Sequence, residues 1–152
     1  MTTFTKWFLL MAVTMTGLFF AEQKGAISLI IQNDKSYLAL AIMGLFVSIS
    51  AYVGSLAYHA DVAKDEQKKQ LIDKSNIGWF CAEHFFSLGL LGTIIGLVLA
   101  TGGSLDGAKP VSEIVDGLKK GLNTAFFTTI CGIVFSLLLQ LQLLVLQSGL
   151  RR

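Results

Sequence analysis

Charged side chains are scarce in this chain of 152 residues: Asp, Glu, Lys and Arg make up only 14% of it. Hydrophobic residues make up 53%, and the mean hydropathy is +0.66, which is the composition of a membrane protein rather than of a soluble domain. The net charge is +2, and the basic residues are dispersed among acids without a basic patch and interleaved aromatics. The composition therefore gives no indication of a nucleic-acid partner.

Cysteine, histidine and the usual signatures of catalysis are equally sparse. Cys81 and Cys131 both lie in apolar segments, where we interpret them as small buried residues with no pairing implied. His59 and His84 are isolated, and the sequence contains no Ser/His/Asp set, metal-ligand spacing or phosphate-binding loop. We therefore predict that the chain is not an enzyme and uses no metal or cofactor.

Four apolar segments are long enough to cross a bilayer, which predicts an all-α, polytopic membrane protein with residues 1–152 in a single membrane domain. The predicted spans are residues 4–21, 37–58, 80–101 and 122–147. Because Lys6 precedes a short apolar run, a signal peptide is the alternative interpretation of the first span. No clear small-x-small cleavage site follows it, so a retained span is favoured.

The basic residues orient these spans only weakly. Seven of them lie on the side of the termini and five on the other side, and Arg151 and Arg152 directly follow the last span. The positive-inside rule then favours both termini in the cytoplasm. Residues 59–78 form a polar stretch that we expect to be a cytoplasmic helical connector. Residues 110–120 have apolar residues at helical spacing, and we expect a helix that either lies along the outer interface or leads into the last span.

Small and polar residues replace leucine along one face of each of the last two spans. At about 100° of rotation per residue, the stripe of the third span holds Gly89, Thr93, Gly96 and Ala100. The stripe of the fourth span holds Gly121, Ala125, Thr128, Thr129, Gly132, Ser136, Gln140 and Gln147. Such residues allow close helix packing without any transport, and Thr hydroxyls can bond to the preceding turn. A glutamine in hydrocarbon needs a partner or water, so a polar path lined by water or by subunits is the other interpretation.

Ionisable residues are absent from the second and fourth spans. The third span contains Glu83 and His84 a few residues after Trp79, and we expect both near the cytoplasmic edge of the membrane. They are either interfacial polar residues or groups for ion exit or gating. A chain that moved protons alone should hold a titratable group near the bilayer centre. Either this protein does not move ions, or a partner supplies the acid.

Two motifs in these spans resemble the MotA/TolQ/ExbB proton-channel family, the ring-forming half of ion-driven membrane motors. Residues 88–97, LGLLGTIIGL, resemble the family's LGLLGTVxG span. Residues 114–132, IVDGLKKGLNTAFFTTICG, are similar to the family's IxxGIxxALxxTxxGL pattern. The order of the motifs and the short loop between them also fit, and the likeness is specific over residues 85–139.

The resemblance implies a homopentamer in a bacterial inner membrane, around two copies of a single-span MotB/TolR/ExbD-like partner that carries the essential membrane Asp. It matches Thr93 and Thr129 to the family's pore-facing threonines and implies that the third and fourth spans line a central pore. The pore-lining residues predicted in this way are Thr93, Thr128, Thr129, Gly96, Ala125, Gly132 and Ser136. Passage of protons or sodium past the partner's Asp would then drive mechanical work.

The chain departs from the family in three places. Its connector, residues 59–78, replaces a large cytoplasmic domain, and Thr124 stands where the TolQ/ExbB branch has an acid. The family's prolines near the pore helices are missing, since the one proline is Pro110.

Two other functions are alternatives to the motor. One is a four-span proton-coupled exporter of lipophilic cations, which needs a membrane carboxylate that the first span lacks. The other is a non-transporting scaffold or pore former.

Overall fold

The computed structural model describes residues 2–102 and 110–151. Lys109, one of the five basic residues counted on the side opposite the termini, and Arg152 therefore lie outside the described residues. The described residues form five helices and no strand: α1 Thr3–Gln23, α2 Ala26–Asn33, α3 Leu38–Val62, α4 Asp65–Gly102 and α5 Val111–Leu150. All but α2 are long and apolar enough to cross a membrane. This confirms the predicted all-α architecture with four candidate membrane-spanning helices.

The last two long helices run well past the predicted spans. α4 has 38 residues and α5 has 40, which correspond to about 57 and 60 Å of helix, against a hydrocarbon core about 30 Å thick. The expected connector, residues 59–78, is not a separate element, because α3 continues to Val62 and α4 begins at Asp65. Residues 111–120 are the first turns of α5. Of the two arrangements expected for residues 110–120, the helix that leads into the last span is therefore the one observed.

The short helix α2 is the element that the sequence pattern did not predict. It follows Gly25, whose φ of 73° suits glycine because a side chain would be strained there. After the helix, the buried carboxylate of Asp34 accepts hydrogen bonds from the backbone nitrogens of Ser36 and Ala39, at 2.9 and 2.8 Å. The second of these bonds caps the first turn of α3. The segment between the first two spans is therefore a folded corner.

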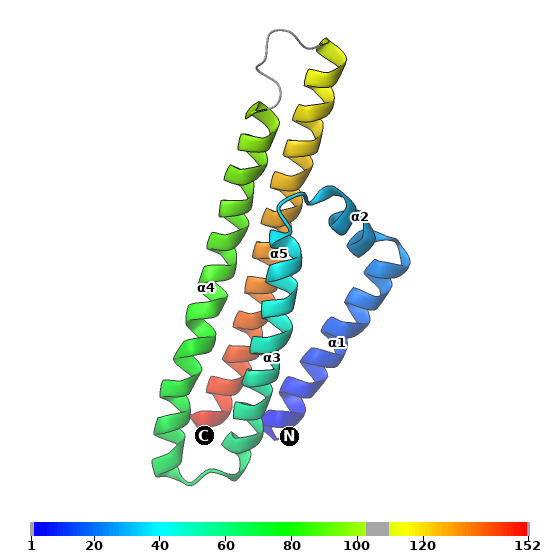
Figure 1. Cartoon of the computed structure of the whole chain (residues 1–152). Coiled ribbons are helices and arrows are strands. Elements are labelled where there is room, and N and C mark those ends of the chain that lie inside the picture. Colours follow the sequence, from blue (N-terminus) through cyan, green and yellow to red (C-terminus); the bar gives the residue numbers. More distant parts are fainter. Residues whose placement is uncertain (1, 103–109, 152) are drawn as a thin grey trace.

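The long helices form one bundle in which α4 and α5 are an antiparallel pair (Figure 1). α3 packs against both of them, and α1 packs against α3 and α5. Phe46 of α3 and Phe135 of α5 meet in the core with ring centroids 4.8 Å apart. The described ends of the chain lie at the same end of the bundle as the α3–α4 turn, and the α4–α5 pair rises beyond α2 at the other end (Figure 1).

A polar cluster in the core helps to hold the outermost helix, α1. Only 6% of its most apolar window is buried, against 44% for α5, so α5 is central and α1 peripheral. Within the core, the amide oxygen of Gln142 accepts hydrogen bonds from the Trp7 indole at 3.1 Å and from the Ser50 hydroxyl at 2.6 Å. Gly54 lies beneath the Trp7 ring, where a Cβ atom would collide with it. These contacts fix α1 to α3 and α5.

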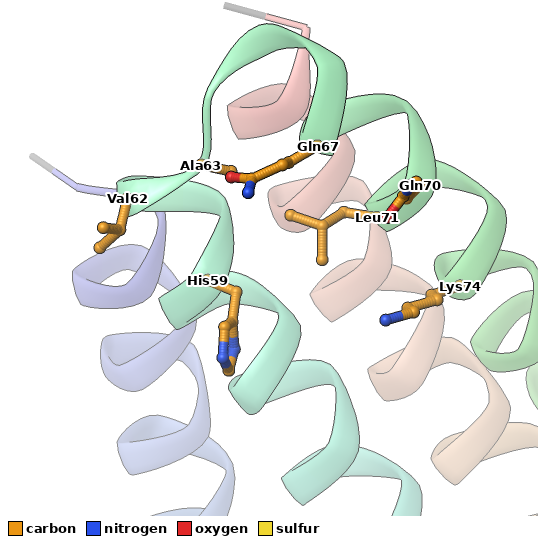
Figure 2. Close-up of a pocket in the computed structure, with 7 residues that line it drawn as sticks. All are labelled: His59, Val62, Ala63, Gln67, Gln70, Leu71 and Lys74. Carbon is orange, nitrogen blue, oxygen red and sulfur yellow. The ribbon is translucent and has the colours of Figure 1, made fainter.

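The α3–α4 turn borders an open pocket of about 250 Å³. Its lining residues are His59, Val62, Ala63, Gln67, Gln70, Leu71 and Lys74 (Figure 2). Leu71 and Lys74 point from α4 toward α3 (Figure 2), and the Leu71 side chain is buried. The region expected as a connector is thus made of two packed helix ends.

Candidate functional site

The glycines of α4 and α5 bring the two backbones into direct contact. A Cβ atom on Gly96 would lie 2.6 Å from the backbone nitrogen of Ala125, and one on Gly132 would lie 2.7 Å from the carbonyl oxygen of Phe85. Neither neighbour can move aside, because both are backbone atoms. Gly96, Ala125 and Gly132 therefore lie in the interface between two helices of one chain, as the packing interpretation of the stripes expects.

Gly92 also lies in this interface, although the sequence stripe did not include it. A Cβ atom at this position would collide with the Thr128 side chain. The buried line of α4 therefore runs through Gly89, Gly92, Gly96 and Ala100, and Thr93 is only half-buried at its edge. The sequence contained a signal for this line, because its four members are three, four and four residues apart, as residues on one face of a helix are. Thr93 lies farther from the centre of that face.

The two adjacent threonines of α5 occupy different environments. Thr128 is fully buried, and its hydroxyl donates to the carbonyl oxygens of Thr124 and Ala125 at 2.9 and 3.0 Å. Thr129 is half-buried, and its hydroxyl donates to Ala125 at 3.0 Å and across the interface to Gly89 at 3.3 Å. Within the chain, Thr129 therefore reaches the surface of the α4–α5 pair and Thr128 does not.

Thr124, in the N-terminal half of α5, has a structural role. Its fully buried hydroxyl donates to the carbonyl oxygen of Asn33, at 2.9 Å, and accepts a hydrogen bond from the backbone nitrogen of Lys35, at 3.3 Å. These bonds attach the corner between α2 and α3 to α5. A threonine at this position thus joins two elements that are far apart in the sequence.

A pocket of about 430 Å³ opens along the outer face of the α4–α5 pair. We call it the Glu83 pocket; its lining residues are Glu83, Phe86, Ile133, Ser136, Leu137 and Gln140. The Ser136 hydroxyl donates to the carbonyl oxygen of Ala82 at 2.7 Å and accepts from the Gln140 amide nitrogen at 3.3 Å. A carboxylate from α4 and two polar side chains from α5 therefore line one hollow whose remaining walls are apolar.

The register of the two helices places this pocket between the level of Lys74 and the level of Lys35. Glu83 follows Lys74 by nine residues, which is about 13 Å of helix. In the other direction, Ser136 follows Thr124, at the level of Lys35, by 12 residues, or about 18 Å. The two stretches together match the roughly 30 Å of a hydrocarbon core. The expectation that Glu83 lies near the cytoplasmic edge of the membrane stays a prediction.

His84, the other residue expected at that edge, is on a different side of α4. Its ring stacks on Phe80 with centroids 3.8 Å apart, and its Nδ1 atom lies 2.7 Å from the Phe80 carbonyl oxygen. It lines an almost wholly apolar pocket of about 520 Å³ together with Leu45 and Ile49 of α3. The structure therefore does not bring Glu83 and His84 together, and their role in ion exit stays a prediction.

Comparison with known proteins gives no relative: no family model, no curated protein and no solved structure matches the chain. Among the described residues, no three His, Cys, Asp or Glu side chains are grouped so that they could hold a metal ion. The four apolar helices define a multi-pass α-helical membrane protein. The candidate functional groups are the polar side chains on the outer face of α4 and α5: Glu83, Thr93, Thr129 and Gln140.

Proposed function

We propose that this chain is the ring-forming subunit of an ion-driven membrane motor or channel, which uses a flow of protons or sodium to do mechanical work together with a single-span partner. The observation that carries the proposal is the set of polar side chains on the outer face of the α4–α5 pair. Thr93 and Thr129 are half-open on this face, and Glu83 and Gln140 line its pocket. A carboxylate and an amide facing lipid would be costly. This face is therefore turned toward another protein surface or toward water.

The opposite side of the bundle has the surface that lipid requires. On α1 the exposed side chains are large and apolar, and they include Phe8, Val13, Phe19 and Phe20. The α4–α5 side also exposes large apolar side chains, among them Leu90, Ile94 and Ile130, so its polar groups form a line within an apolar surface. Such a line fits a closed ring in which α4 and α5 surround the axis. The resemblance to the MotA/TolQ/ExbB family supports five such subunits in a bacterial inner membrane, with both termini in the cytoplasm.

The threonines give the axis hydroxyl groups without a fixed charge. A hydroxyl can donate, accept and rotate, so it can assist an ion or a proton that passes between the ring and a carboxylate on the partner. A lysine or arginine at Thr93 or Thr129 would hold that carboxylate in an ion pair and stop the cycle. In this proposal the two half-open threonines assist the ion, and the buried Thr128 supports the helix pair.

Native mass spectrometry of the complex, extracted gently from its own membrane, tests the assembly. We expect five copies of this chain with two copies of a small single-span protein that has an Asp in its apolar segment. A dimer of this chain alone would contradict the ring and favour the exporter. Five copies without any partner would support the pore but contradict the role given to a partner's acid.

A further inference from the structure

The Glu83 pocket contains a carboxylate that the partner-based cycle does not use. The segment of α5 from Gly121 to Leu150, which faces it, has no Asp, Glu, Lys, Arg or His. The nearest histidine, His84, lines the pocket on the other side of α4. α3 contributes no charged side chain to the Glu83 pocket either. Within the described chain, the exposed Glu83 therefore has no cationic side chain beside it in the pocket. It is also the one Asp, Glu, Lys or Arg in residues 75–102 of α4, a stretch apolar enough for a membrane, where an isolated charge is unfavourable.

The polar groups beside Glu83 are suited to a small hard cation. The Gln140 amide nitrogen donates to Ser136, so its amide oxygen stays available as a ligand atom. The Ser136 hydroxyl donates its proton to Ala82 and accepts from Gln140, so its oxygen keeps one lone pair and offers no donor. Together with the carboxylate, these groups offer oxygen ligands from two helices, and oxygen is the ligand atom that hard cations prefer.

We propose that Glu83, Ser136 and Gln140 form a binding site for a monovalent alkali cation, with sodium as the fitting example. One positive charge neutralises the one carboxylate, whereas a divalent ion would leave a net charge in the apolar length of the bundle. A proton alone would need only the carboxylate and would not use the two oxygens on α5. The site lies within one chain, so cation binding does not require the ring. Its place in ion passage rests on the proposed function.

The test is protection of Glu83 from a hydrophobic carbodiimide, a reagent that modifies protonated carboxyl groups in apolar surroundings. The purified full-length chain is labelled at fixed pH and ionic strength in choline, potassium, sodium or lithium chloride, and the labelled residue is identified by peptide mass spectrometry. We expect labelling at Glu83 to slow roughly tenfold when the bound cation is present at about ten times its dissociation constant. Thermal unfolding in the same salts gives a second measurement, in which the cation should raise the Tm.

Three variants separate the ligands from the carboxyl group itself. Ser136→Ala and Gln140→Leu should still be labelled but should lose the protection, because each removes an oxygen ligand. Glu83→Gln should show neither the labelling nor the cation-dependent rise in Tm. Glu113→Gln, in the exposed first turn of α5, is the matched control and should behave like the unmodified chain.

Equal labelling rates in all four salts would overturn the proposal. So would an unlabelled Glu83 combined with a Tm that does not depend on the cation. Protection of Glu83 in a chain that forms no ring would keep the cation site and contradict the motor. A ring with its single-span partner but without protection would contradict the cation site alone.

Discussion

Thr128 and Thr129 are neighbours with the same side chain, yet they lie on two different sides of the α4–α5 interface. Thr128 is enclosed between the helices, and its hydroxyl bonds only to carbonyl oxygens of α5. Thr129 lies on the side that also carries Ser136 and Gln140, and its hydroxyl reaches Gly89 of α4. A rotation of about 100° between successive residues is the whole difference. A hydroxyl in an apolar span therefore indicates a polar path only once its side of the helix is known.

The largest effect is expected from closing the space between the two helices. In Gly96→Leu, the new side chain meets the backbone of Gly121 and Ala125, and we expect a loss of about 3 kcal/mol or more, with failure to assemble. Thermal unfolding in detergent and size-exclusion chromatography measure this. Gly17→Leu is the control, because a Cβ atom at Gly17 has nothing within 4 Å. Equal stability of the two variants would contradict the close packing.

The outer side of the interface is tested by Thr129→Val. We expect assembly to be kept and ion flux, or the driven phenotype, to be lost, because valine keeps the shape of threonine and removes its hydroxyl. Flux into vesicles that contain the assembled complex is the measurement, and replacement of sodium by potassium at fixed pH distinguishes sodium from protons. Normal conduction by an assembled Thr129→Val complex would show that this residue has no part in the path.

Gln142 and Gln140 of α5 are a second pair of like residues, of which the first lies in the core and the second on the open side. In Gln142→Leu, the Trp7 indole and the Ser50 hydroxyl lose their shared acceptor, and we expect a cost of about 1–3 kcal/mol. Gln140→Leu, on the open side of the same helix, should cost less stability, because Gln140 is only half-buried. The Tm of each variant, compared with that of the unmodified chain, measures the two losses of stability. An unchanged Tm for Gln142→Leu would mean that this cluster does not hold α1.

The smallest effect is expected on the inner side, from Thr128→Val. Its hydroxyl bonds only within its own helix, so its removal should cost about 1 kcal/mol or less and leave ion flux in place. Flux and thermal unfolding are measured beside Thr129→Val. If Thr128→Val stops conduction as completely as Thr129→Val does, the two sides of the interface are not functionally different.

The apolar runs predicted the four long helices because length and hydropathy are properties of the sequence itself. The glycine spacing likewise predicted close packing of the last two spans. The corner at α2 was not predicted, since it depends on the left-handed backbone at Gly25 and on the Asp34 carboxylate that caps α3. Gln142 was also missed, because its partners Trp7 and Ser50 come from two other helices.

The sequence by itself determined that this is a four-span helical protein with a glycine-rich, hydroxyl-bearing pair of last spans. The tertiary structure decided which polar groups the pair encloses and which it leaves open. It also placed Glu83 beside Ser136 and Gln140 of α5. The reason is that neighbours and exposure depend on the register and rotation of α4 against α5. Those are set where the glycines let the two backbones touch.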